Sequence, residues 1–268
     1  MSRARFRFYA ELNDFLPRER RFVELEHTFL GRPSVKDVIE SLGIPHTEVD
    51  LVLADGESVD FSWRLHDGAR VSVYPMFEAI DVAPLARVRP APLREVRFVL
   101  DGHLGRLARH LRMLGFDARW RIDASDDELA RVSADEHRVL LTRDRGLLKR
   151  RIVTHGYWVR ATDPRAQLAE VVRRLDLSRL IAPFQRCLRC NEPLAEVAKE
   201  EVEAELPPAV RLRHTSFRRC PACRRVYWAG SHHSRMTQLV SELLAEHRTG
   251  FGLTREGVDF EGGQPPRS

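Results

Sequence analysis

Three aspartates in the middle of the chain stand where their carboxylates could hold a metal ion. Asp101 follows the apolar run VRFVL, Asp144 follows RVLLTR, and Asp126 opens the helical pattern SDDELARVSA. If the apolar runs are parallel strands, their carboxyl ends meet at one edge of a sheet and bring the carboxylates together. Clustered carboxylates repel one another unless a cation lies between them, and oxygen ligands favour Mg²⁺ or Mn²⁺. The pattern therefore predicts a site where one or two metal ions activate water for attack on a phosphoryl group.

Each of these aspartates also has a purely structural interpretation. Ser125 and Glu128 flank Asp126 in the S-x-x-E pattern of a helix capping box, where acids favour the helix start. Asp101 precedes a glycine and Asp144 precedes an Arg-Gly pair, so both could be turn residues. The metal-site hypothesis therefore depends on the conjunction of the three positions rather than on any one of them.

All four cysteines of the chain fall in one segment, as two C-x2-C pairs with 29 residues between them. The pairs are Cys187 with Cys190 and Cys220 with Cys223. Two knuckles that each present two thiolates predict a tetrahedral zinc site, and four protein ligands make it structural rather than catalytic. Disulfides or an iron–sulfur cluster are the less favoured alternatives. We expect the charged insertion AEVAKEEVEAELPPAVR between the pairs to loop out.

Arginine dominates the positive charge, since Lys36, Lys149 and Lys199 are the only lysines among 44 basic residues. On the helical pattern after Asp101, leucines form an apolar stripe. Candidate RNA-backbone contacts lie around that helix and after the third strand, namely Arg106, Arg109, Arg112 and Arg143. Tyr227 and Trp228, after the second cysteine pair, could stack on bases or be buried in a ribbon. A solvated polar face is the alternative for the arginines.

Length and composition describe a chain of two or more domains. The 268 residues carry a net charge of +5, and no apolar run approaches the length of a membrane span. The N-terminus alternates polar and apolar residues and lacks a signal-peptide core. We expect a cytoplasmic protein without a membrane partner.

The elements that must position these residues follow from hydrophobic periodicity. The stretches RFRFYAEL and RRFVELEHTF predict strands, Ser34 predicts a helix cap, and further strands follow, which is the order of a β-grasp, or ubiquitin-like, module. Strand and helix patterns then alternate, which indicates an α/β unit with a mostly parallel sheet. We expect a β-grasp domain at 1–81, a linker at 82–94, an α/β domain at 95–180, a zinc ribbon at 181–235, and a C-terminal helix with a disordered tail at 236–268.

The order of these motifs resembles one family of nucleases. VLDGHLGRLARHLRMLGFD, SDDELARVSA and RVLLTRDRGLL, followed by the cysteines, resemble PIN-type ribonucleases, and among them the Mut7-C RNase domain with its ubiquitin-like N-terminal domain. The resemblance implies that Asp101, Asp126 and Asp144 are the metal-binding acids, because the second acid lies about 18 residues before a T-x-D motif. It also implies a further acid, for which Asp117, Asp123 and Asp127 are candidates.

These observations predict a metal-dependent ribonuclease with catalytic Mg²⁺ or Mn²⁺ and structural Zn²⁺. The alternative is a non-catalytic RNA-binding or ribosome-associated adaptor that uses the zinc ribbon. A sulfur-transfer accessory role, suggested by the N-terminal module, lacks the C-terminal diglycine of such carriers. We expect the β-grasp domain to dock a protein partner or to restrict access to the site.

Overall fold

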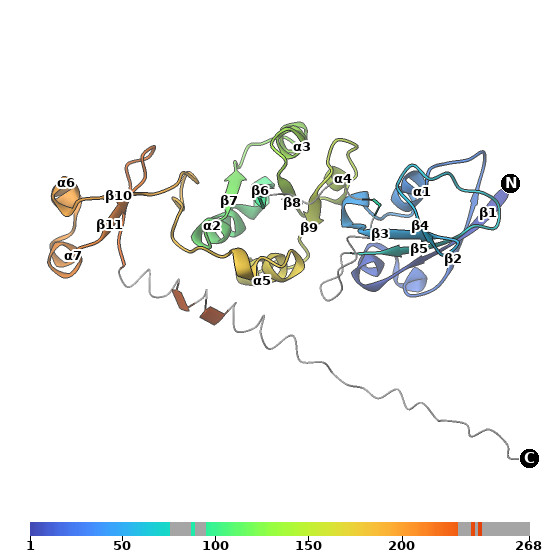
Figure 1. Ribbon diagram of the computed structural model, residues 1–268, viewed down its shortest axis with the longest axis horizontal. Coiled ribbons are helices and arrows are strands. Elements are labelled where there is room, and N and C mark those ends of the chain that lie inside the picture. The colour runs from blue at the N-terminus through green and yellow to red at the C-terminus, as the bar shows by residue number, and fades with distance from the viewer. Residues whose placement is uncertain (76–86, 89–94, 230–236, 239–240, 243–268) are drawn as a thin grey trace, which may run out of the picture.

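The computed structural model describes residues 1–75, 87–88, 95–229, 237–238 and 241–242. Figure 1 shows three lobes in a row, which follow one another along the chain. Within those ranges, no helix has the length and apolar character needed to cross a membrane. The predicted linker and C-terminal tail fall largely outside the described residues.

The N-terminal lobe is the predicted β-grasp domain. Its strand order is β2-β1-β5-β3-β4, in which β1 and β5 are parallel and the other pairs are antiparallel. Ser34 caps its helix through a capping box with Asp37, as the sequence predicts. Its elements are β1 (Ser2–Phe8), η1 (Ala10–Phe15), η2 (Arg18–Arg20), β2 (Leu25–Phe29), α1 (Val35–Ser41), η3 (His46–Glu48), β3 (Leu51–Ala54), β4 (Glu57–Ser58) and β5 (Arg70–Tyr74).

The first two strands are shorter than predicted, because the backbone turns sharply between them. Ala10 and Phe22 adopt left-handed conformations, with φ of 47° and 59°, which no strand continues through. The buried Asn13 holds this corner, since its amide donates to the Phe8 carbonyl and accepts from the Phe22 amide. Strand pairing therefore stops at Phe8 and resumes at Leu25.

The central lobe is an α/β unit whose four strands are all parallel, in the order β7-β6-β8-β9. This confirms the predicted alternation of strands and helices. The elements are β6 (Arg97–Leu100), η4 (Gly102–Leu104), α2 (Gly105–Met113), β7 (Asp117–Trp120), α3 (Asp126–Asp135), β8 (Val139–Thr142), α4 (Arg145–Leu148), β9 (Gly156–Trp158), α5 (Pro164–Arg174) and η5 (Ser178–Leu180).

Both faces of this sheet are buried, because alternate strand residues point to opposite sides. Phe98 and Leu100 of β6 pack in a core with residues of α2 and α5, whereas Val99 packs with residues of α3 and α4. The chain leaving β6 therefore enters the helix on one face, and the chain leaving β8 enters the helix on the other. Since β6 and β8 are neighbours, they form the point where the strand order reverses.

The C-terminal lobe is a small antiparallel sheet in the order β10-β11-β12. The charged insertion does not loop out as predicted. It forms a strand and short helices, and Val202 and Leu206 pack against Phe217 in a core of their own. The elements are β10 (Ala195–Val197), α6 (Lys199–Val202), η6 (Glu203–Glu205), α7 (Pro208–Arg213), β11 (Phe217–Arg219) and β12 (Val226–Tyr227).

Candidate active site and zinc centre

Asp101 and Asp144 lie at the carboxyl ends of β6 and β8, where the strand order reverses. Between them lies Thr142, whose side chain is fully buried. Its hydroxyl donates to Oδ2 of Asp101 at 2.8 Å and accepts from the backbone amide of Asp144 at 2.9 Å. Ligands of open α/β sheets bind in the crevice at such a switch point. The T-x-D motif contains this threonine, but the sequence reasoning gave it no role.

The backbone after Asp101 requires two glycines. Trp120 at the end of β7 donates its indole N–H to the Gly102 carbonyl at 3.0 Å. A Cβ on Gly102 would lie 2.7 Å from the Ile122 carbonyl oxygen, and one on Gly105 would lie 2.6 Å from the Trp120 ring. The D-G-x-x-G pattern therefore lets the loop after β7 approach the loop that carries Asp101.

Asp144 is also a helix cap, which is the structural interpretation the sequence left open. Its Oδ1 accepts from the Gly146 amide at 2.7 Å at the start of α4. Its side chain is exposed at the edge of the sheet. Capping fixes the direction of the carboxylate, so this function and metal binding are compatible.

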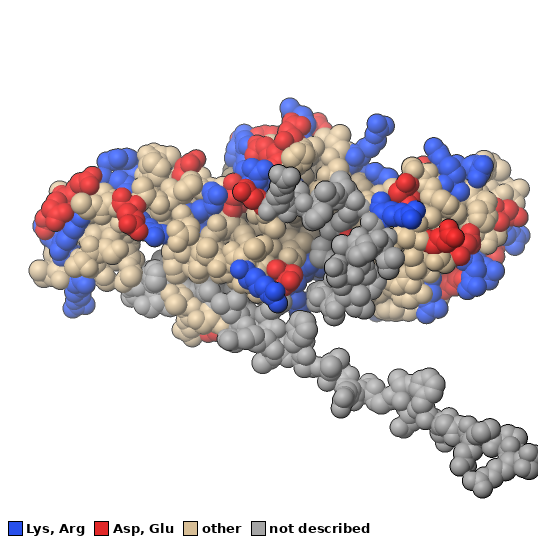
Figure 2. Space-filling view, viewed as in Figure 1, with Lys and Arg blue, Asp and Glu red and all other residues tan. Residues whose placement is uncertain are grey.

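The start of α3 brings further carboxylates to this edge. Asp126 is the first residue of α3, and Asp127 beside it forms an ion pair with Arg150, which follows α4. Arg150 has a raised pKa because of its hydrogen bond with Asp127, and the charges of Asp126 and Asp144 raise it further. Figure 2 shows acidic and basic side chains side by side in this central part of the molecule. A guanidinium thus lies among the acids of the predicted site.

Only half of the capping box predicted at α3 is present. Ser125 accepts from the Glu128 amide at 3.3 Å, but the Glu128 carboxylate turns away and accepts from Arg121 at 2.8 Å. Arg121 also pairs with the exposed Asp123. The acids around the helix start are therefore held by arginines rather than by the helix end alone.

Asp117 and Asp123 lie at opposite ends of β7: Asp117 begins the strand and Asp123 follows its carboxyl end. Asp117 opens β7 beside Arg97, the first residue of β6, roughly 13 Å along the strands from Asp101. Burial alone would raise the pKa of Asp117, but hydrogen bonds from Arg138 and Asn191 hold it below the usual value. Asp117 thus lies at the end of its strand away from Asp101, and Arg138 and Asn191 engage its carboxylate.

The four predicted arginines have different environments. Arg106 and Arg109 are exposed on α2 and have no ion pair within the described part of the chain. Arg143 is exposed, but its guanidinium donates to the carbonyls of Arg160 and Ala161.

Arg112, also predicted to contact RNA, is held inside the protein. It is only 4% exposed and donates to the Ala118, Leu188 and Arg189 carbonyls at 2.9, 3.3 and 2.7 Å.

The four cysteines form a compact metal-binding group. Cys187 and Cys223 have their sulfurs 3.5 Å apart, Cys190 and Cys220 have theirs 3.3 Å apart, and all four lie within 4.8 Å of one another. Tetrahedral Zn²⁺ with Zn–S bonds of about 2.3 Å spaces its sulfurs about 3.8 Å apart, so the donor set and spacing fit zinc. The Tyr227 hydroxyl lies 3.2 Å from the Cys187 sulfur and accepts from the Leu188 backbone amide at 3.1 Å, so its polar end is turned toward the cysteine cluster.

The carboxylates at the switch point are less tightly grouped than the cysteines. Among residues whose placement is described, the cysteine cluster is the one set of three or more histidine, cysteine or acidic side chains with all ligand atoms within 4.8 Å. Asp101, Asp126 and Asp144 therefore share an edge of the sheet without meeting this criterion.

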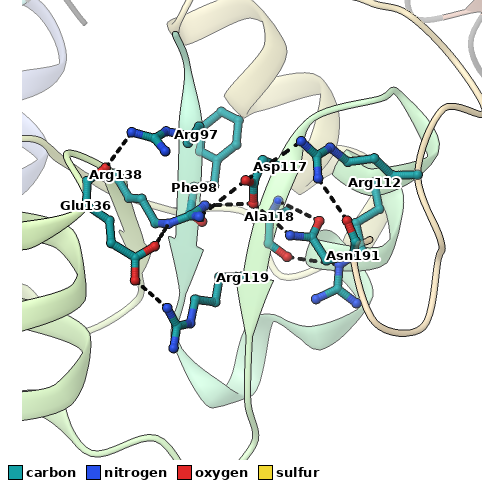
Figure 3. Close-up of polar contacts among 10 residues, drawn as sticks. Arg97, Phe98, Arg112, Asp117, Ala118, Arg119, Glu136, Arg138 and Asn191 are labelled. Carbon is teal, nitrogen blue, oxygen red and sulfur yellow. Dashed lines mark hydrogen bonds and ion pairs between the residues drawn. The ribbon is translucent and has the colours of Figure 1, made fainter. Parts of the chain in front are cut away.

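The first cysteine knuckle, residues 187–191, is docked against the parallel sheet (Figure 3). Asn191 has a left-handed backbone with φ of 75°. The oxygen of its side-chain amide accepts from the Ala118 backbone amide at 3.0 Å, and the nitrogen donates to the Asp117 carboxylate at 2.7 Å. Arg112 reaches the knuckle from the sheet side through the two carbonyls before Cys190. Because β7 is an edge strand, the knuckle pairs a backbone amide that would otherwise lack a strand partner.

Two family models match the chain. The Mut7-C RNAse domain matches residues 96–240, and the Mut7-C ubiquitin matches residues 1–81. Comparisons with curated proteins and with solved structures gave no match. The larger match covers more than half of the chain and points to a ribonuclease-type hydrolase.

Replacing Gly105 with alanine should destabilise the protein by about 1–3 kcal/mol, because the new methyl group would collide with the Trp120 ring. Urea unfolding followed by tryptophan fluorescence measures the change. Arg109→Ala on the exposed face of the same helix should change stability by less than about 0.5 kcal/mol. An unchanged midpoint for Gly105→Ala would show that the ring can move freely.

Replacing Asn191 with alanine should loosen β7 while leaving zinc bound, because it unpairs the Ala118 amide without touching a cysteine. We expect a loss of about 1–3 kcal/mol. Zinc content checks that the metal stays bound, and amide hydrogen exchange at residues 117–120 checks that β7 is loosened. Cys190→Ser, which removes a zinc ligand, should raise the same exchange, and unchanged protection of β7 in zinc-free protein would contradict the docking.

Proposed function

The chain belongs to the Mut7-C RNAse domain family, and on that premise we propose that it is a metal-dependent ribonuclease that hydrolyses RNA phosphodiester bonds. The observation that carries the proposal is the link between Asp101 and Asp144 through the Thr142 hydroxyl, at the switch point of the sheet. The family match supplies the reaction class, and the position of these carboxylates supplies a place for it.

We assign Asp101, Asp126 and Asp144 to Mg²⁺ or Mn²⁺. Their carboxylate oxygens are the donors that these ions prefer, and Asp123, which follows β7 at the same edge, is the better candidate for the further acid. When bound, such an ion supplies a water of lowered pKa and positive charge at the phosphate. Thr142 keeps the first and last of these ligands at a fixed separation, because one buried hydroxyl bonds to both residues.

Exposed arginines beside the site are suited to hold the RNA backbone. Arg106 and Arg109 lie on the helix that begins just after Asp101, and their side chains face solvent. Guanidinium groups bind phosphate with two parallel hydrogen bonds. Arg150 forms an ion pair with Asp127, the residue next to Asp126. These residues would orient the scissile phosphate toward the metal-binding acids.

Exchanging Asp101 and Asp144 for asparagine should abolish Mn²⁺-dependent cleavage of single-stranded RNA. We expect a loss of at least about 10²-fold, since both changes remove negative charge from the metal site while preserving side-chain size. A fluorescent RNA substrate measures the rate. Asp135→Asn, an exposed acid at the far end of α3, is the matched control and should retain activity.

The same assay separates the enzyme from an RNA-binding adaptor. Undiminished cleavage by the folded double variant would contradict the assignment of Asp101 and Asp144 as metal ligands. Absence of cleavage by the unmodified protein, with RNA affinity equal in the presence and absence of Mn²⁺, would instead favour the adaptor.

A further inference from the structure

The ubiquitin-like domain covers the second edge of the nuclease sheet. Edge strand β9 would otherwise present unpaired backbone groups to solvent. Glu48 of η3, which is 1% exposed, accepts from the Trp158 backbone amide at 2.5 Å. His46, in the same turn, donates to the Val153 carbonyl at 2.8 Å. The two domains are thus joined by hydrogen bonds to the backbone beside the candidate active site.

A cation–π stack extends this interface to the residue after Asp144. The guanidinium carbon of Arg145 lies 3.9 Å from the centre of the Trp158 ring and 5.0 Å from that of Phe15. The same guanidinium donates to the carbonyls of Asp14 and Phe15, each at 3.4 Å. Phe15 belongs to the buried core of the N-terminal domain. The charge of Arg145 is therefore engaged within the protein.

The residue before Asp144 is held by the same tryptophan. The indole N–H of Trp158 donates to the Arg143 carbonyl at 3.2 Å. Trp158 is itself fixed by Glu48 through its amide and by Phe15 through a ring contact at 5.0 Å between centroids. Trp158, which the N-terminal domain holds in place, therefore contacts both neighbours of Asp144: the backbone of Arg143 and the side chain of Arg145.

We propose that the ubiquitin-like domain positions Asp144 for metal binding, with Arg145 and Trp158 as the positioning residues. This inference rests on the proposed ribonuclease function. A carboxylate ligand on a loop must be held to a fraction of an ångström to bind a metal ion well, and supporting contacts supply that precision. Thr142 fixes the Asp144 amide from the sheet side, and the stack fixes its neighbours from the domain side.

Arg145→Gln tests the proposal, because it removes the guanidinium nearest to the Trp158 ring and leaves the metal ligands intact; Arg160, at 5.1 Å from the same ring, stays in place. We expect the Mn²⁺ concentration for half-saturation to rise roughly 2- to 30-fold, measured both by Mn²⁺ electron paramagnetic resonance and by RNA cleavage. The KM for RNA should not change. Arg151→Gln, an exposed arginine just beyond α4, is the matched control with the same charge change and should behave as the unmodified protein.

A second variant acts from the other domain. Phe15→Leu keeps an apolar side chain in the core but removes the ring, so it should raise Mn²⁺ half-saturation in the same direction as Arg145→Gln. The double variant should add little to either single change, since all of them interrupt one stack. Amide hydrogen exchange of residues 143–148, measured without metal or RNA, should rise in each variant.

The outcomes separate this inference from the function on which it rests. Faster exchange at 143–148 with unchanged Mn²⁺ half-saturation would overturn the positioning role, and so would an effect of Arg145→Gln on the KM alone, which would make Arg145 an RNA contact. Equal Mn²⁺ binding by the unmodified protein and by Asp101→Asn would overturn the metal site itself. Unchanged exchange in Phe15→Leu would overturn the support by the N-terminal domain, whatever the protein's activity.

Discussion

The buried hydroxyl of Thr142 is the contact on which the candidate site depends. It works in both directions, because it donates to a carboxylate on one side and accepts from an amide on the other. A crevice opens where two neighbouring strands are followed by helices on opposite faces of the sheet. The crevice alone does not fix the positions of the residues that line it. One side chain that bonds to both strand ends removes that freedom at the cost of a single buried polar group, fully satisfied.

The same sheet imposes a second constraint, which the flanking domains meet with different chemistry. Its edge strands are β7 and β9, and each has backbone groups that no strand pairs. The first cysteine pair supplies the asparagine side-chain amide at β7. A turn of the ubiquitin-like domain supplies a carboxylate to Trp158 of β9 and an imidazole to Val153, which precedes β9. The three lobes are thus bound together through the backbone of one sheet rather than through apolar surfaces alone.

The order of strands and helices could be predicted from the sequence because hydrophobic periodicity, caps and turns are local signals. The cysteine cluster could be predicted as well, because the C-x2-C spacing places two sulfurs close together in each pair. The burial of Arg112 could not be predicted, because its position on a helix says nothing of the two carbonyls, 76 and 77 residues later, to which it donates. The sequence could not decide whether Asp117 lies near Asp101 for a related reason. Which end of a strand an acid occupies depends on where the strand begins and on its register with the neighbouring strand. The early ends of the first strands depend on non-glycine residues with positive φ, which have no sequence signal.

The two covers of the sheet differ in when they are synthesised. The groups of the N-terminal domain that bond to β9 and to the chain just before it lie 107 and 110 residues before their partners, whereas Asn191 lies 73 residues after the amide it pairs. Domains fold largely as units, N-terminal first, as the chain leaves the ribosome. Strand β9 therefore emerges next to a domain that is already able to receive it, while β7 stays open until the first knuckle has been made. During synthesis the exposed edge of this sheet is therefore the one that the first cysteine pair later helps to close.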